Sequence, residues 1–208
     1  MPIILLIRHG ENEYTRTGKL AGWTRGVHLN EQGQKQADAL ARRLGQAPIA
    51  ALYCSPLERA RETAAPLAQS KKLRVQIEAG LGEVRYGEWT GQSLKRLART
   101  RLWRVVQQHP SQMEFPGGET FRAVQSRAVE AVERISREHA KTKGLVACVS
   151  HGDVIKLIVA HYLGLPLDLF QRLVINTASL TTLRLGTGQP ALVKLNDTSP
   201  GHDSQTAA

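Results

Sequence analysis

Three short polar motifs contain the residue types that phosphoryl transfer requires, and each directly follows an apolar run. The motifs are Arg8-His9-Gly10, Ser55-Pro56-Leu57-Glu58-Arg59 and Ser150-His151-Gly152. Arginine carries planar, permanently charged donors that match phosphate oxygens. A neutral imidazole can attack phosphorus and become a phosphohistidine, which water later hydrolyses. If the three motifs meet, they supply two imidazoles and two guanidiniums to one site.

The apolar runs before these motifs are predicted to be β-strands, and a helical pattern follows most of them. The predicted strands are Pro2 to Ile7, Ile49 to Cys54, Arg74 to Ile77, Gly144 to Ser150, Asn176 to Leu185 and Ala191 to Leu195. The predicted helices are Asn30 to Gly45, a segment from Ser55-Pro56 to Gln69, Gln92 to Gln108, Glu119 to Lys141 and Asp153 to Tyr162. Ser55 is interpreted as a helix N-cap, with Pro56 at the first helical position.

This alternation predicts an α/β fold: a three-layer sandwich with a mostly parallel central sheet and helices on both faces. Ligands of such sheets bind outside the carboxyl ends of the strands, which is where the three motifs lie. A segment of about residues 86–119 interrupts the alternation and is predicted to be a small helical lid. Residues 1–195 are predicted to form a single domain, and the polar residues 196–208 a disordered tail.

Composition limits the class of protein and its partners. The chain has 208 residues, of which 41% are hydrophobic and 22% charged, as in soluble globular domains. No apolar run approaches the roughly 18 residues that span a bilayer. The opening residues lack the basic start and long apolar core of a signal peptide. We therefore expect a cytoplasmic protein without a membrane partner.

The formal net charge of +10 favours anionic partners. Zinc-finger spacing and an aromatic-basic RNA-binding signature are both missing from the sequence, so we expect a small phosphorylated substrate rather than a nucleic acid. The basic residues are dispersed, and their longest concentration falls in the predicted lid. It is either a solvated helix face or a contact for a second anionic group of the substrate. Its members are Lys95, Arg96, Arg99, Arg101 and Arg104.

A divalent metal site is the alternative use of the two histidines. His9 and His151 could bind an ion together with Glu11, Glu83 or Asp153. No paired-histidine helical spacing supports this arrangement. Because Arg8 beside His9 would also repel a cation, we predict neither a metal nor another cofactor.

The ordered set of motifs resembles the histidine phosphatase superfamily, the phosphoglycerate-mutase-like proteins. The resemblance extends from Met1 to about Leu185, and the ordered set is far more specific than the Arg-His-Gly triplet alone. The matching segments are Ile7 to Glu11, Gly18 to Trp23, Leu29 to Gly33, Ser55 to Ala64, Leu81 to Glu83, Tyr86 to Gly91, Pro116 to Glu119 and Val149 to Gly152.

The resemblance implies roles for individual residues. It makes His9 the phosphorylated nucleophile and Glu83 the general acid that later activates water. It places His151 beside the phosphoryl group as the third catalytic residue. Glu119 is expected to cap a helix and to be mainly structural. The residues expected to bind phosphate or substrate are Arg8, Arg59, Thr15, Gly22 and Gly152.

Two positions depart from the family pattern. Tyr14-Thr15 replaces a Trp-Asn pair whose amide normally contacts phosphate, and Thr15 offers only a shorter hydroxyl donor. His28 stands where a proline is usual, and we interpret it as a surface histidine.

The same core residues serve phosphatases and phosphomutases. This chain is shorter than the cofactor-dependent glycolytic mutases and lacks their longer insertion and their lysine- and glycine-bearing tail. We therefore predict a phosphomonoester hydrolase that acts on a small phosphorylated metabolite. The alternatives are a phosphoglycerate-type phosphomutase and a non-catalytic protein that binds phospho-ligands or nucleic acid. A homodimer is expected from the family alone.

Overall fold

A six-stranded mixed sheet forms the centre of the computed structural model, which describes residues 2–186 and 188–199. The strand order is β3-β2-β4-β1-β5-β6. The first four strands of this order are mutually parallel, β5 is antiparallel to β1, and β6 is antiparallel to β5. The mostly parallel sheet is therefore confirmed. The strands are β1 (Ile3–Arg8), β2 (Ile49–Cys54), β3 (Val75–Ile77), β4 (Leu145–Ser150), β5 (Leu180–Arg184) and β6 (Ala191–Asp197).

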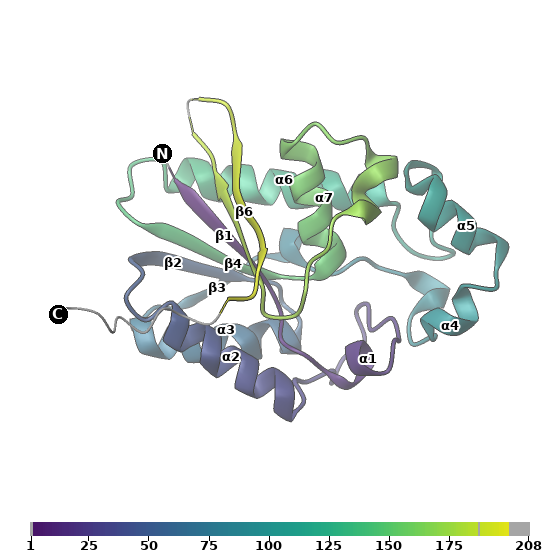
Figure 1. The fold of residues 1–208 in the computed structure, drawn as a ribbon, viewed down its shortest axis with the longest axis horizontal. Coiled ribbons are helices and arrows are strands. Elements are labelled where there is room, and N and C mark those ends of the chain that lie inside the picture. The colour runs from purple at the N-terminus through teal and green to yellow at the C-terminus, as the bar shows by residue number, and fades with distance from the viewer. Residues whose placement is uncertain (1, 187, 200–208) are drawn as a thin grey trace.

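Helices cover both faces of the sheet, as the predicted three-layer sandwich requires (Figure 1). Alternate residues of a strand point to opposite faces. Leu5 and Ile7 of β1 accordingly belong to the core beneath α2 (Glu31–Arg43) and α3 (Glu58–Lys71). Ile4 and Leu6 of β1 belong to the core beneath α6 (Phe121–Glu138) and α7 (Gly152–Tyr162).

The predicted lid is helical, but it differs from the single helix expected over Gln92 to Gln108. The segment forms α4 (Leu94–Leu97) and α5 (Arg101–Gln108). Ser93 and Thr100 each accept a backbone N–H through their hydroxyl groups and so start separate helices. The other short helices are α1 (Glu13–Arg16), η1 (Ala79–Leu81), η2 (Gly87–Trp89), η3 (Pro110–Gln112) and η4 (Leu167–Arg172).

Two further boundaries correct the sequence predictions. Ser55 does not cap α3, because the helix begins at Glu58 and its N-cap is Leu57. β6 continues to Asp197, so Asn196 and Asp197 belong to the sheet and not to a disordered tail. Residues 200–208 of the predicted tail lie outside the described residues. None of the helices described is long and apolar enough to cross a membrane.

Candidate active site

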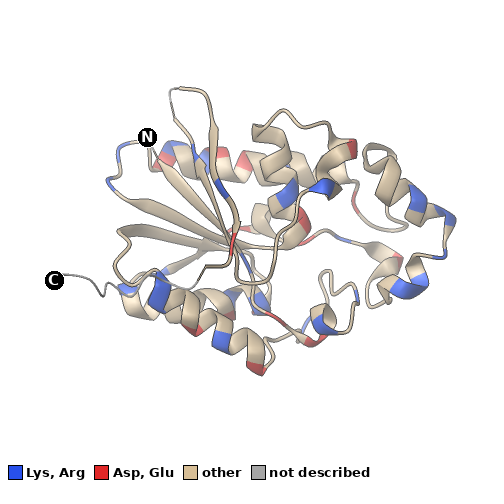
Figure 2. Cartoon of the chain, in the orientation of Figure 1, with Lys and Arg blue, Asp and Glu red and all other residues tan. Residues whose placement is uncertain are grey.

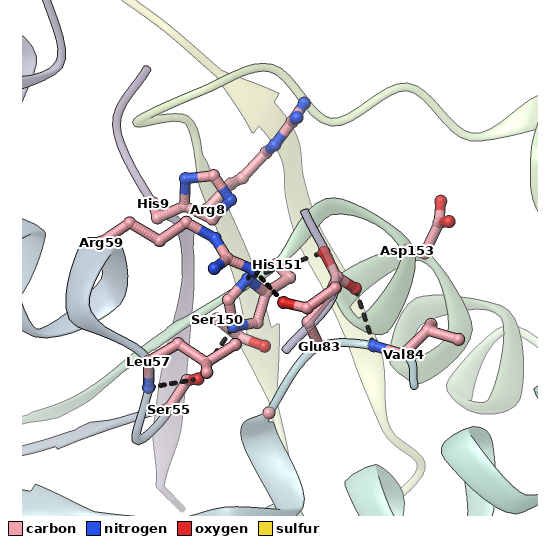
Figure 3. Close-up of polar contacts among 12 residues, drawn as sticks. Arg8, His9, Ser55, Leu57, Arg59, Glu83, Val84, Ser150, His151 and Asp153 are labelled. Carbon is pink, nitrogen blue, oxygen red and sulfur yellow. Dashed lines mark hydrogen bonds and ion pairs between the residues drawn. The ribbon is translucent and has the colours of Figure 1, made fainter. Parts of the chain in front are cut away.

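The three polar motifs meet at the carboxyl ends of adjacent strands, as the sequence predicted (Figure 3). β1 and β4 pair in parallel with Arg8 opposite Ser150, so His9 and His151 emerge side by side. β2 pairs with the other edge of β4 and brings the start of α3 to the same place. The centroids of the two imidazole rings are 5.1 Å apart.

His9 is held as a neutral imidazole with one free nitrogen. The residue is buried, and its Nδ1 lies 2.7 Å from the carbonyl oxygen of Gly10. Because a carbonyl only accepts hydrogen bonds, Nδ1 carries the proton and Nε2 keeps its lone pair. Burial lowers the pKa of His9 well below its usual value, and the charges of Arg59 and Arg8 lower it further. The ring is therefore a ready nucleophile near neutral pH.

Arg8 and Arg59 bring charged donors, some of which have no partner within the described part of the chain. Nη2 of Arg59 donates to the carbonyl of Gly22 at 2.9 Å, and Nη1 of Arg8 donates to that of Ile175 at 2.6 Å. The buried Nε atoms of both arginines and Nη1 of Arg59 have no partner among the residues described. Burial also lowers the pKa of Arg59. Buried cationic donors are costly unless they are paired, so this arrangement favours a bound anion.

His151 is fully buried and makes contacts with both nitrogens. Its Nε2 is 2.8 Å from Oγ of Ser55, and its Nδ1 is 3.3 Å from Nη2 of Arg59. Since a guanidinium only donates, Nδ1 accepts and Nε2 carries the proton. Burial lowers the pKa of His151, with Arg59 and His9 adding to the effect. Sequence reasoning assigned Ser55 to helix capping and missed this contact.

Glu83 is the carboxyl group of the site. Its Oε1 accepts from the backbone N–H of Val84 at 2.9 Å, and its Oε2 is 3.6 Å from Nδ1 of His151. Burial raises the pKa of Glu83 to about 7, and the negative charge of Asp153 adds to this rise. A carboxyl group with this pKa can give and take a proton near neutral pH.

The two glycines predicted for the site, Gly22 and Gly152, lie near its arginines. Gly22 has a φ of +50° and directs its carbonyl to Arg59. Gly152 begins α7, where a Cβ would lie 3.3 Å from the Arg8 guanidinium carbon. Both therefore lie against the arginines of the site.

Thr15 is committed elsewhere, because its hydroxyl donates to the carbonyl of Asn12 and accepts that residue's N–H. It forms a capping box for α1 and has no free donor for phosphate.

Two further polar residues were missed or left open by the sequence. Asn12 is fully buried, and its Nδ2 has no partner within the described part of the chain. Only its proximity to His9 in the sequence could have indicated it. His28 is a surface histidine, as expected, and pairs with Glu62, which raises the pKa of the imidazole.

The donor set resembles a metal site in distance but not in charge. The ligand atoms of His9, Glu83 and His151 all lie within 4.8 Å of one another. Burial lowers the pKa of His9, however, and the positive charges of Arg59 and Arg8 lower it further. The same field repels a cation and attracts a phosphate group. The arrangement therefore fits the predicted anion better than the alternative metal.

Comparison with known proteins adds independent findings. A family model described as the histidine phosphatase superfamily (branch 1) matches residues 4–198. The chain is 29% identical over 200 residues to phosphoserine phosphatase 1 of Hydrogenobacter thermophilus, covering 94% of this chain and 92% of the relative. It is 34% identical over 161 residues to the metal-independent phosphoserine phosphatase of Arabidopsis thaliana, covering 74% and 66%. The structure of Bacillus stearothermophilus YhfR superposes with a TM-score of 0.88 at 28% identity, covering 96% and 98% of the two chains.

Proposed function

The chain belongs to the histidine phosphatase superfamily, and we propose that it is a metal-independent phosphomonoester hydrolase with a phosphohistidine intermediate at His9. One observation supports this proposal above the others. A neutral imidazole with a free Nε2 lies beside buried guanidinium donors that lack a partner within the described residues. A phosphoryl group would satisfy those donors and place phosphorus next to the nucleophile.

In the first step, Arg8 and Arg59 bind the phosphoryl oxygens and Nε2 of His9 attacks phosphorus. The N–P bond forms as the bond from phosphorus to the ester oxygen breaks. Glu83, protonated at and below its pKa of about 7, gives its proton to the departing oxygen. The alcohol leaves, and Glu83 becomes a carboxylate.

In the second step, the Glu83 carboxylate takes a proton from a water molecule, whose oxygen attacks the phosphorus of the phosphohistidine. The N–P bond breaks and its electrons return to His9. Inorganic phosphate leaves, and both residues regain their starting protonation states. His151 stays neutral in both steps, and its Nδ1, which lies 3.3 Å from Nη2 of Arg59, helps to hold the guanidinium that binds the phosphoryl oxygens.

The substrate is proposed to be a small phosphorylated metabolite with a second charged group. Two of the relatives described above are named phosphoserine phosphatases, which makes phosphoserine the first compound to assay. The basic residues of α4 and α5 suit an additional carboxylate or phosphate. A cytoplasmic location and a homodimer also stay proposals from the sequence and the family.

The deciding experiment measures phosphate release from a panel of phosphomonoesters in excess EDTA. We expect the wild-type activity to survive EDTA. His9→Ala should lose at least about 10³-fold in kcat, because nucleophilic catalysis is removed. A reaction with substrate labelled in its phosphoryl group, stopped with detergent at alkaline pH, should leave an acid-labile, base-stable label on the wild type alone. His161→Ala, an exposed histidine at the far end of α7, is the matched control and should keep full activity.

Two outcomes would contradict the proposal. Activity that EDTA abolishes and a divalent metal restores would make the cluster of His9, Glu83 and His151 a metal site. Interconversion of 3-phosphoglycerate and 2-phosphoglycerate that depends on a bisphosphate primer would make the protein a phosphomutase.

A further inference from the structure

One side chain from α6 holds the backbone of the segment that carries Glu83. Nη1 of Arg127 donates to the carbonyls of Gly80 and Gly82, both at 2.8 Å, and its Nη2 donates to the carbonyl of Glu83 at 2.9 Å. We propose that Arg127 is a positioning residue that fixes the general acid Glu83 against the phosphoryl site. This inference rests on the role of Glu83 proposed above.

Arg127 is itself held in one orientation. Its Nε and Nη2 each donate at 2.9 Å to a different oxygen of Glu119. A guanidinium has five N–H donors, and these two bonds together with the three to carbonyls use all of them. Glu119 also accepts the backbone N–H of Arg85 at 2.9 Å. The carboxylate that the sequence suggested as a helix cap therefore fixes the arginine instead.

The segment is also confined from its other side. Nε1 of Trp23 donates to the carbonyl of Glu83 at 2.6 Å, so this oxygen accepts from two directions. A Cβ at Gly82 would lie only 2.5 Å from a ring carbon of Trp23, which leaves room for glycine alone. The backbone of Glu83 is thus fixed between α6 and the loop that also carries Gly22.

A fixed backbone at Glu83 keeps its carboxyl group in place for proton transfer. The carboxyl group of Glu83 is neutral in one half of the reaction cycle and charged in the other, and its charged form loses solvation when buried. Without a fixed backbone, the carboxylate could turn outward to water and leave the ester oxygen unprotonated. Misplacement of a catalytic group by about 1 Å can lower the rate by about 10²-fold.

The test compares two esters of similar size that differ in their need for an acid. The leaving group of benzyl phosphate is an alkoxide that must be protonated, whereas that of p-nitrophenyl phosphate is a stable anion. In Arg127→Met we expect kcat/KM for benzyl phosphate to fall by about 10²-fold. The value for p-nitrophenyl phosphate should fall much less, because its departure does not depend on Glu83.

Arg134→Met is the matched control. Arg134 lies on the same helix and pairs with Glu78, near the start of the same segment, but it has no hydrogen bond to the carbonyls of residues 80–83. We expect its ratio of the two kcat/KM values to equal that of the wild type. If this control changes the ratio as much as Arg127→Met does, loss of any arginine from α6 has the same consequence, and the inference fails.

Glu83→Gln separates the inference from the function on which it rests. If Glu83→Gln lowers both esters equally, the general-acid role proposed for Glu83 is wrong. If Glu83→Gln lowers kcat/KM mainly for benzyl phosphate while Arg127→Met lowers it for both esters in proportion, Arg127 is only structural.

Should Arg127→Met not fold, Arg127→Lys replaces it, since the ammonium keeps the charge but cannot reach all three carbonyls. A wild-type ratio in folded Arg127→Lys would overturn the inference.

Discussion

The two histidines of the site carry their protons on opposite ring nitrogens. His9 commits its Nδ1 proton to the carbonyl of Gly10 and exposes Nε2 for attack. His151 directs its Nε2 to the hydroxyl of Ser55 and turns Nδ1 towards Arg59 and Glu83. The hydrogen-bond partner of one nitrogen therefore decides what the other nitrogen can do.

Asp153 offers a way to test the protonation state of Glu83. Its carboxylate accepts from the hydroxyl of Tyr86 at 3.1 Å and from Nζ of Lys156 at 3.2 Å, and its charge helps to raise the pKa of Glu83. In Asp153→Asn this negative charge is gone, so Glu83 should lose its proton at a lower pH. The alkaline limb of kcat/KM against pH for benzyl phosphate should therefore move to lower pH.

The control for this pH profile is Glu130→Gln. Glu130 is exposed on α6, and within the described chain its carboxylate has a hydrogen bond with Ser126 and no ion pair. This variant should leave the limb in place. An alkaline limb that stays in place or moves to higher pH in Asp153→Asn would show that Asp153 does not raise the pKa of the catalytic acid.

Among the helices and strands, capping hydroxyl groups and hydrogen bonds from distant parts of the chain set where each element begins and ends. Capping hydroxyls at Ser93 and Thr100 divide the lid into two helices. β6 extends beyond its predicted end because Arg43 of α2 donates to both the carbonyl and the carboxylate of Asp197. A boundary made by a helix from elsewhere in the chain has no local signature in the strand itself.

The ion pair between Arg43 and Asp197 predicts that Asp197→Asn is less stable than the wild type by an amount that depends on pH. The hydrogen bond from Lys194, followed by those from Ser199, lowers the pKa of Asp197, and the charge of Arg43 adds to the effect. A depressed pKa stabilises the fold above the ordinary pKa of an aspartate, and this contribution is lost as the pH falls below it. Asp197→Asn should therefore lower the free energy of unfolding at pH 7 by about 1 kcal/mol.

Urea unfolding at several pH values measures this difference, which should shrink below about pH 4. Glu13→Gln removes an exposed carboxylate paired with Arg16 and is the control, expected to show no measurable change. A deficit in Asp197→Asn that is as large at acidic pH as at pH 7 would mean that packing, not charge, holds the end of β6.

At the scale of the whole molecule, the charge of +10 is unevenly neutralised. Several arginines of α2 and α6 pair with carboxylates, whereas the described structure records no ion pair for the basic side chains of α4 and α5. Figure 2 marks the positions of lysine and arginine in blue along this part of the chain. α4 is tied to the loop before Gly22 by the N–H of Leu94, which donates to the carbonyl of Gly18. This bond places the start of α4 beside the loop that leads to Gly22, whose carbonyl contacts Arg59.

Reversing charge on the lid tests whether it attracts the substrate. In the double variant Arg99→Glu and Arg101→Glu, KM for 3-phosphoglycerate should rise by about tenfold, because a favourable field becomes repulsive. KM for p-nitrophenyl phosphate, which lacks a second anionic group, should rise less. Added salt should reduce the difference. Lys141→Glu with Lys143→Glu, two exposed positions just before β4 begins, is the matched control. An unchanged KM would remove the lid from substrate recognition.

The sheet and the meeting of the three motifs could be predicted from local sequence patterns alone. Apolar runs of strand length alternate with helical patterns, and parallel strands bring the residues that follow them to one edge. Local pattern was therefore enough to place His9, Arg59 and His151 together, and the family resemblance added Glu83.

The chemical state of these residues and the contacts that hold them depend on the tertiary structure. The proton on Nδ1 of His9, the pKa of Glu83 near 7 and the committed hydroxyl of Thr15 depend on burial and on individual partners. The contact of His151 with Ser55 spans 96 positions of the chain, and that of Arg127 with Glu83 spans 44. Periodicity reports which face of an element is buried, but a pKa or a hydrogen bond depends on which distant atoms share that buried space.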